Sequence, residues 1–338
     1  MTRREVWAVA LAGALLVAGC GTGATAPGGS EAAPGDGGSG APEKATVSIG
    51  AVTIVSHPSL DAVFEGIREG LAQAGYVEGE NLTLEFQNPQ GDQATLTSIA
   101  NTYAASDHDL FVALATPPAQ ALAQVVQDRP IVFASVTDPV AAGLVESMDN
   151  PGGNVTGTSD QLPTDEQLAV IQRIMPDVET VGIVYSSAEV NAQVQAEAAI
   201  EAGAELGIEV KTATITNSSE VQQAAESLDV DAYFVLVDNT VVSAMESMIQ
   251  VAEQRQRLLV TSDPDSVARG AAAALATDYK AQGVQTAGLI ARILEGADPA
   301  DTPVELAEGL ALVVNPAAAE RMGITIPDDV LADAATTY

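Results

Sequence analysis

The sequence predicts an α/β protein of two similar lobes, each built on a parallel β-sheet. One observation behind this prediction is a unit that occurs twice. Residues 109–143 read DLFVALATPPAQALAQVVQDRPIVFASVTDPVAAG, and residues 231–270 read DAYFVLVDNTVVSAMESMIQVAEQRQRLLVTSDPDSVARG. Each unit has an apolar run of strand length, a polar turn, a helical stretch and a second apolar strand, which is the βαβ pattern of parallel sheets. The second observation is that the same alternation of strands and helices precedes both units.

The elements of the first lobe follow from hydrophobic spacing and turn signals. The segment 59–75 has apolar residues at helical spacing and ends on Gly75, and Asp92 is placed to cap a helix that runs to Ser106. The run NPGGN at 150–154 is a strong turn signal. The strands expected in this lobe are residues 47–55, 82–86, 110–115, 131–134 and 155–159.

The pattern then restarts in the second lobe. The expected strands are residues 180–185, 208–213, 232–237, 258–260 and 271–276, and the expected helices include 162–175, 190–206, 218–228 and 278–294. After these we expect an extended stretch at 304–314, a helix at 316–322 and a tail. Because elements remain after two complete lobes, the chain should cross back between them. The expected division is 45–160 with 275–300 for the first lobe, and 161–274 with 301–338 for the second.

The first 44 residues indicate export and anchoring. Two arginines precede an apolar core that is too short to span a membrane comfortably, which is typical of a signal peptide over residues 1–19. The peptide ends in VAG before Cys20, the single cysteine, and this resembles a lipobox whose cysteine becomes acylated. Residues 20–44 are rich in Gly, Ala, Pro and Ser, as in a flexible tether. We therefore expect an extracytoplasmic protein held to the membrane by a lipid anchor on Cys20.

Composition excludes several classes of function. The formal net charge of −33 argues against nucleic-acid binding, which needs clustered Lys and Arg. His57 and His108 are not at metal-ligand spacing, and no G-x-S-x-G or glycine-rich phosphate loop is present. We expect no enzymatic activity, no metal, no cofactor and a monomeric chain.

The polar residues that follow the strands predict a binding cleft, because ligands of open parallel sheets bind beyond the carboxyl ends of the strands. Several acids there, with little compensating base, favour a ligand ammonium, for which Asp238 is the first candidate and Asp263 the second. Helix N-termini at the turns TPPAQ and TDP would hold a carboxylate. Together these features describe a zwitterionic amino acid. The candidate ligand residues are Ser56, His57, Thr116, Pro117, Ala119, Gln120, Thr137, Asp138, Asp160, Tyr185, Asn191, Asp238, Asn239, Thr240 and Asp263.

Each candidate also has a structural interpretation. An Asp or Thr after a strand is often only the N-cap of the next helix, and this applies to Thr116, Thr137 and every acid in the set. His57, which precedes Pro58, is equally consistent with an ordinary loop residue. Tyr185 could belong to the core of its lobe.

Several segments resemble the substrate-binding lipoproteins of ABC importers, and more narrowly a family whose members bind tryptophan and other aromatic amino acids. The segments include SHPSLDAVFEGIREGLAQAGYVEGENLTLEFQNPQGD, PIVFASVTDPVAAGLV, PGGNVTGTSD and TSDPDSVARGA. The resemblance covers about residues 45–330. It implies two Rossmann-like lobes of the type I periplasmic-binding-protein class, a cleft that closes over the ligand, and delivery to permease subunits in the membrane. This chain departs from the family at Ser56, where Glu is expected, and at Pro118, where a small polar residue is expected.

Two alternatives stay open from the sequence. The ligand could be another small polar solute, such as a nucleoside or a sugar-like molecule, although a sugar usually stacks on Trp and the only one is Trp7. The protein could instead sense a ligand and signal to a partner without transport.

Overall fold

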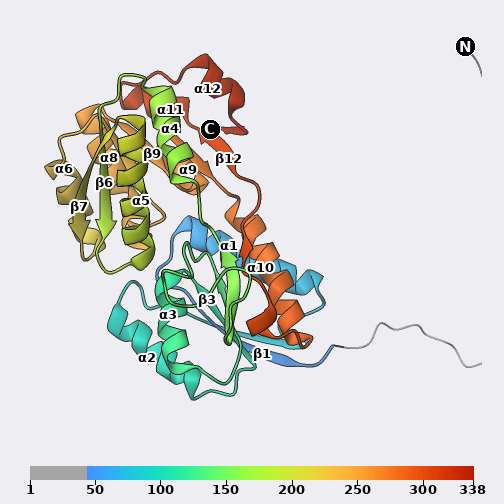
Figure 1. The fold of residues 1–338 in the computed structure, drawn as a ribbon. Coiled ribbons are helices and arrows are strands. Elements are labelled where there is room, and N and C mark those ends of the chain that lie inside the picture. Colours follow the sequence, from blue (N-terminus) through green and yellow to red (C-terminus); the bar gives the residue numbers. More distant parts are fainter. Residues whose placement is uncertain (1–43) are drawn as a thin grey trace, which may run out of the picture. The chain divides into compact units, whose positions relative to one another are not determined.

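The computed structural model describes residues 44–338. The expected signal peptide, Cys20 and all of the expected tether except Lys44 lie outside this range. Residues Lys44–Tyr338 form one unit that contains two β-sheets (Figure 1). No helix in this part of the chain is both long and apolar enough to cross a bilayer.

The first sheet contains six strands, all parallel, in the order β11-β5-β4-β3-β1-β2. Every residue of β3, β4 and β5 is buried, as expected of parallel strands that are covered on both faces. The strands are β1 (Val47–Val52), β2 (Leu82–Gln87), β3 (Leu110–Leu114), β4 (Ile131–Ala134), β5 (Val155–Ser159) and β11 (Glu305–Leu306).

The second sheet has seven strands in the order β13-β12-β10-β9-β8-β6-β7. Only the β10–β12 pair is antiparallel. Its strands are β6 (Thr180–Ser186), β7 (Glu209–Ile215), β8 (Ala232–Val235), β9 (Leu258–Thr261), β10 (Ala273–Ala276), β12 (Ala311–Val314) and β13 (Thr336–Thr337). Two lobes with parallel sheets are thus confirmed, and each lobe has its own hydrophobic core.

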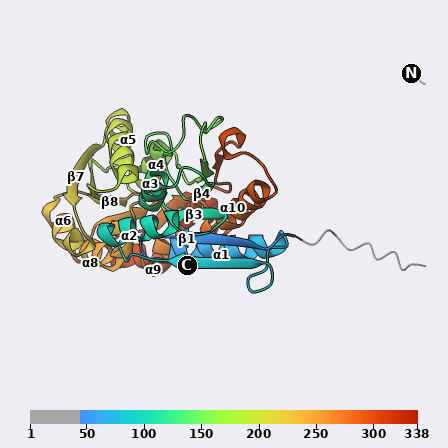
Figure 2. The same cartoon turned by 90° about the horizontal axis from the view of Figure 1, so that it is seen from below.

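Four helices cover the first sheet. The helices α2 and α3 pack against each other on one face, while α1 and α10 pack on the other, so that β1 and β3 lie between α3 and α1 when seen from below (Figure 2). These helices are α1 (Pro58–Gln73), α2 (Gln93–Ala104), α3 (Thr116–Val125) and α10 (Tyr279–Leu294). The Asp92 side chain accepts the Thr95 N–H at 2.7 Å and so caps α2, as the sequence predicts.

The remaining helices belong mainly to the second lobe. They are α4 (Thr164–Ile174), α5 (Val190–Leu206), α6 (Val221–Ser227), α7 (Asn239–Ser243), α8 (Met245–Arg255), α9 (Pro264–Arg269), α11 (Pro316–Arg321) and α12 (Asp328–Asp333), with 3-10 turns at Ser218–Glu220 and Pro299–Asp301. The expected cap Ser218 is wrong, because Asn217 takes this role by accepting the Ser219 N–H. The expected tail is also wrong, since it forms α12 and β13.

The chain crosses between the lobes three times: after β5, after β10 and between β11 and β12. The last crossing follows Glu305–Leu306, which pairs with β5 of the first sheet. The sequence-based division assigned residues 301–338 to the second lobe, so this crossing lies a few residues later than expected. A two-residue strand has no hydrophobic pattern from which its sheet could be predicted.

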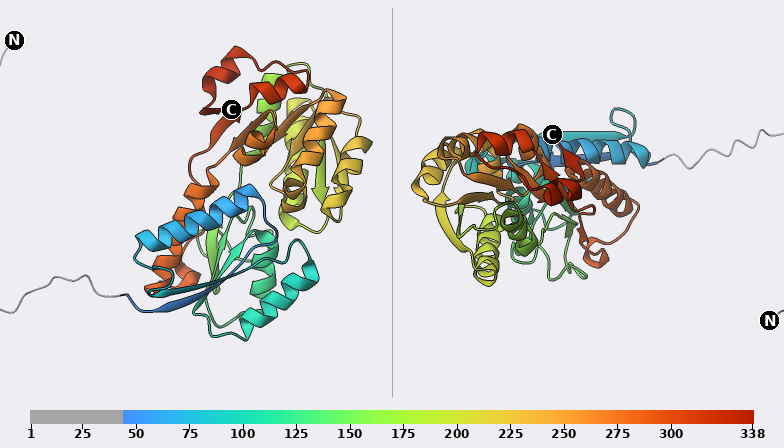
Figure 3. Two further views of the ribbon diagram at one scale, coloured as in Figure 1. Left: turned by 180° about the vertical axis from the view of Figure 1, so that it is seen from behind. Right: turned by 90° about the horizontal axis from the view of Figure 1, so that it is seen from above.

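The helices α1 and α10 lie side by side, as the view from behind shows (Figure 3), and they meet at glycines. A Cβ atom on Gly66 would lie 2.1 Å from the Lys280 carbonyl oxygen, and one on Gly283 would lie 2.1 Å from the Val63 carbonyl oxygen. Side chains at either position would force the two helices apart. This contact fixes α1 against the helix that enters the first lobe at the second crossing.

We predict that Gly66→Ala lowers the free energy of unfolding by about 1–3 kcal/mol, because the added methyl group overpacks the α1–α10 contact. Gly288→Ala on α10 is the matched control, since no atom lies within 4 Å of its added Cβ. The control should be neutral or stabilising by up to about 1 kcal/mol through helix propensity. Urea denaturation measures both, and equal effects of the two substitutions would contradict the close contact.

A candidate ligand site between the lobes

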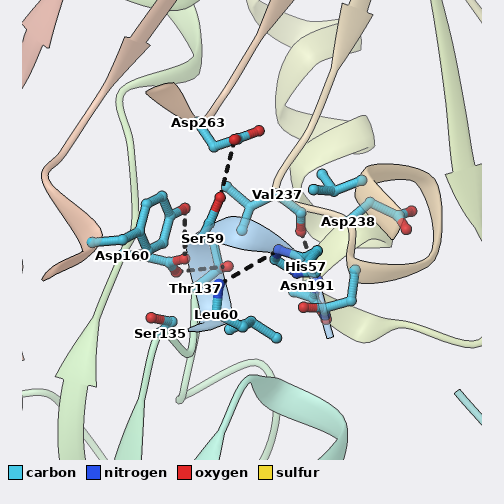
Figure 4. A pocket seen from close by; sticks show the side chains of 13 residues that line it. His57, Ser59, Leu60, Ser135, Thr137, Asp160, Asn191, Val237, Asp238 and Asp263 are labelled. Atoms are coloured by element: carbon cyan, nitrogen blue, oxygen red, sulfur yellow. Dashed lines mark hydrogen bonds between the residues drawn. The ribbon is translucent and has the colours of Figure 1, made fainter. Parts of the chain in front are cut away.

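A cavity lies beyond the carboxyl ends of strands from both sheets (Figure 4). The first lobe contributes residues that follow β1, β4 and β5: His57, Ser59, Leu60, Ser135, Thr137 and Asp160. The second lobe contributes residues near the ends of β6, β8 and β9: Asn191, Val237, Asp238, Asn239, Val242 and Asp263. Tyr279, at the start of α10, completes the lining. The cavity therefore occupies the position that parallel topology predicts for a ligand.

Seven of the fifteen predicted ligand residues line this cavity: His57, Thr137, Asp160, Asn191, Asp238, Asn239 and Asp263. Eight do not: Ser56, Thr116, Pro117, Ala119, Gln120, Asp138, Tyr185 and Thr240. Six lining residues were not predicted from the sequence. Some lie inside predicted helices or apolar runs, and one follows a strand but has no acidic side chain. They are Ser59, Leu60, Ser135, Val237, Val242 and Tyr279.

Most of the residues outside the cavity have other contacts, whereas the buried Thr116 hydroxyl has no hydrogen-bond partner within residues 44–338. The Ser56 hydroxyl donates to Asp61 at 2.8 Å, and Asp138 accepts the Ala141 N–H at 2.8 Å within a turn. Pro117 and Gln120 line a separate surface groove beside α2. Tyr185 packs against the core of the second lobe, as its alternative interpretation states.

The helix ends predicted to hold a carboxylate are also not available as expected. No helix begins at the TDP turn, where residues 139–143 form only turns. The first turn of α3 contains Pro117 and Pro118, which have no N–H, and the next amide, Ala119, donates to the Ala115 carbonyl. The residues at the start of α3 also do not line the cavity, so a ligand carboxylate there needs a different donor.

The first candidate for the ammonium, Asp238, has both oxygens occupied by backbone donors. Its Oδ1 accepts the Val241 N–H at 2.9 Å as the cap of α7, and its Oδ2 accepts the Ser186 N–H at 2.6 Å. Burial, and secondly the neighbouring charge of Glu189, raise the pKa of Asp238 well above its usual range. The structural interpretation as a helix cap thus fits Asp238 better than contact with a ligand.

Glu189 holds in place the loop between β8 and α7, which borders the cavity. The side chain is buried and accepts hydrogen bonds from the Asn239 backbone and amide, from the Thr240 backbone and hydroxyl, and from the Asn191 amide. These contacts fix the two asparagines that line the cavity. The sequence gives no signal for this role, because Glu189 precedes its helix like many surface glutamates.

A second buried acid links two of the crossing segments. Asp160 follows β5 at the first crossing and accepts the hydroxyl of Thr137 at 3.0 Å and that of Tyr279, at the second crossing, at 3.2 Å. Burial raises the pKa of Asp160 to about 6 despite these two hydrogen bonds. The charge state of Asp160 should therefore change near neutral pH.

Three buried polar atoms of the lining have no hydrogen-bond partner within residues 44–338: His57 Nε2, Asn191 Oδ1 and Asp263 Oδ2. His57 Nδ1 accepts the Leu60 N–H at 3.5 Å, which assigns the ring proton to Nε2, and burial lowers the pKa of His57, which favours the neutral ring. The Asn191 amide nitrogen donates to the Val237 carbonyl at 2.8 Å, which leaves its oxygen free. The cavity thus offers one donor and two acceptors, and buried polar atoms normally have partners.

The charge of the lining is one-sided. Asp160, Asp238 and Asp263 supply three carboxyl groups, and this cavity has no Lys or Arg among the residues that line it. In the described part of the chain, no group of three or more His, Cys, Asp or Glu is arranged to hold a metal ion. An organic cation fits this environment better than an anion does.

Residues 48–338 match the family described as ABC transporter substrate binding protein. The chain belongs to this family. Proteins of this family act outside the cytoplasm and pass their ligands to permease subunits, and the resemblance of the sequence motifs to such proteins is confirmed. A tyrosine-binding protein of Clostridioides difficile (strain R20291) is 37% identical over 270 residues, which cover 79% of this chain and 78% of that protein.

Solved structures agree with this assignment. A conserved domain protein from Vibrio cholerae O1 biovar El Tor is 42% identical with a TM-score of 0.85, and covers 87% of this chain and 100% of its own. An ABC domain in complex with L-Trp from Streptococcus pneumoniae is 35% identical with a TM-score of 0.84 and the same coverage. A ligand-free, open structure of a substrate binding protein from Clostridium difficile is 34% identical over 86% of this chain and 98% of its own, but its TM-score is 0.66.

We predict that Asp160→Asn stabilises the protein in a pH-dependent way. The folded pKa of about 6 lies above the usual value of 3.8, so the stability that Asp160 contributes is present in full below pH 4 and is lost as the pH rises through 6. At pH 8, the free energy of unfolding of the variant should therefore exceed that of the unsubstituted protein by up to about 3 kcal/mol. At pH 4, the two free energies should be nearly equal. Urea titrations at both values measure this, and a difference that does not depend on pH would contradict the raised pKa.

Proposed function

We propose that this member of the ABC substrate-binding family binds an aromatic α-amino acid in the cavity between its lobes and presents it to a permease. The observation that carries the proposal is the set of three unpartnered buried atoms, one donor and two acceptors, on the wall of one cavity. An α-amino acid carries an ammonium, which needs acceptors, and a carboxylate, which needs a donor. The lining supplies both kinds of atom.

The ammonium belongs with Asp263 Oδ2 and Asn191 Oδ1, since these are the two free acceptors and Asp263 also supplies negative charge. The carboxylate belongs with the protonated Nε2 of His57, the free donor of the set. This assignment replaces Asp238, the first choice from the sequence, with Asp263, the second. It also replaces the helix ends with His57.

The remaining surface of the cavity suits an aromatic side chain. Leu60, Val237 and Val242 provide apolar contact, and the ring of Tyr279 can pack against another ring. The relatives named for tyrosine and solved with L-Trp support the same class of ligand for this chain. Binding and release without covalent chemistry is the activity we propose.

We also propose that Cys20 anchors the protein to the outer face of the membrane through acyl chains, as the VAGC sequence indicates. Cys20→Ser should abolish incorporation of a fatty-acid label, because serine lacks the thiol that is acylated. Labelling of the cellular protein with an alkyne fatty acid measures this. Equal labelling of both proteins would contradict the proposed anchor.

The carboxylate contact is tested with His57→Phe, which keeps a ring but removes the donor. Affinity for L-tyrosine should fall by roughly 1.5–3 kcal/mol, the range for a hydrogen bond to a charged group, as measured by isothermal titration calorimetry. Tyramine has no carboxylate and serves as the matched ligand, so its affinity should change by less than threefold in the same variant. If the unsubstituted protein binds neither L-tyrosine nor L-tryptophan, the proposed ligand class is wrong.

A further inference from the structure

One side-chain hydrogen bond joins the two lobes at the cavity. The Ser59 hydroxyl, in the first turn of α1, donates to Asp263 Oδ1 at 3.0 Å, and both side chains are buried (Figure 4). Asp263 caps α9 of the second lobe through the Ser266 N–H, which also donates to Oδ1 at 2.8 Å. This contact can form only while the lobes are together, because α1 and α9 pack on different sheets.

The other oxygen of the same carboxylate has no donor, and Asp263 lines the cavity. Asp263 Oδ2 has no partner within the described residues, and the side chain is only 4% exposed. The surrounding lining adds Asp160 and Asp238 and no Lys or Arg. A buried carboxylate without a compensating charge is costly, whereas separation of the lobes returns it to water.

We propose that Asp263 makes closure of the lobes conditional on a cationic group in the ligand. Oδ1 holds the closed lobes together through Ser59, and Oδ2 opposes closure until a ligand ammonium neutralises it. This inference rests on the proposed function, and it adds that the positive charge, rather than the aromatic ring, triggers closure. One residue thereby joins ligand recognition to the contact between lobes.

This arrangement predicts how analogues of one ligand behave. Tyramine keeps the ammonium and the ring and should close the lobes. 3-(4-Hydroxyphenyl)propionate keeps the carboxylate and the ring but has no ammonium, and it should not close them even at millimolar concentration. L-tyrosine should act like tyramine.

Hydrogen–deuterium exchange of the full chain, followed by mass spectrometry, measures closure. Peptides that contain residues 57–61 and 261–266 lie on the two sides of the contact, and their amides should exchange at least threefold more slowly with L-tyrosine or tyramine. The propionate should leave exchange unchanged. Equal protection by the propionate and tyramine would overturn the inference.

Asp263→Asn gives the sharpest outcome, because it removes the charge but keeps an oxygen that can accept from Ser59 and cap α9. Without ligand, this variant should exchange at least threefold more slowly in both peptides than the unsubstituted protein, although it binds L-tyrosine more weakly. An ordinary contact residue would not have this effect on the free protein. Exchange as fast as that of the unsubstituted protein would overturn the proposed opposition to closure.

Ser59→Ala tests the contact itself, and Ser266→Ala is its matched control, since the Ser266 hydroxyl is also buried but has no partner in residues 44–338. Affinity for L-tyrosine should fall about tenfold in the first variant and less than twofold in the second. Equal affinities in both variants would overturn the contact between lobes while leaving the proposed ligand class intact. Absence of any L-tyrosine or L-tryptophan binding would instead count against the proposed function.

Discussion

In both lobes, parallel strands end at the same cavity, and this arrangement determines which side chains can contact a ligand. A strand end releases the chain into a turn, and a turn that is buried between two lobes must find partners for its polar groups. Here those partners are found mostly inside each lobe, through caps such as Asp238 on α7 and through Glu189. Three of the side-chain atoms that stay unpartnered belong to residues that line the cavity.

Four buried acids near this cavity perform different tasks although they resemble one another in sequence. Asp238 and Glu189 accept mainly from donors of their own lobe, and so they fix the walls. Asp160 connects the two crossing segments through Tyr279. Asp263 alone has a carboxylate oxygen that lacks a donor, and it also contacts the opposite lobe. The hydrogen-bond partners, rather than the residue type, therefore separate the structural acids from the candidate for ligand contact.

Much of the fold could be predicted because its strands are short apolar runs between clear turn signals. The repeated βαβ unit gave the parallel order, and Gly207 ends α5 in the left-handed conformation that glycine favours. The short elements were missed: β11 and β13 have two residues each, and Ala244 interrupts the second repeated helix between α7 and α8. Too few residues are present in such elements for a periodic pattern.

The site was predicted by position and only partly by residue. The sequence locates the turns after the strands. It cannot show that the Ser186 N–H on a neighbouring strand donates to Asp238, or that the Ser59 hydroxyl from the other lobe donates to Asp263. Tyr279 was not predicted as a site residue, because it lies in the first turn of a predicted helix. These contacts depend on tertiary geometry, which brings together residues up to about two hundred positions apart, as for Ser59 and Asp263.

A crystal structure with L-tyrosine bound tests the central claim most directly. The account predicts the ligand nitrogen about 3 Å from both Asp263 Oδ2 and Asn191 Oδ1, and a carboxylate oxygen at the same distance from His57 Nε2. The Ser59–Asp263 hydrogen bond should be present in that complex. A ligand bound in the reverse orientation, with its carboxylate beside Asn191 and its ammonium away from Asp263, would contradict the account.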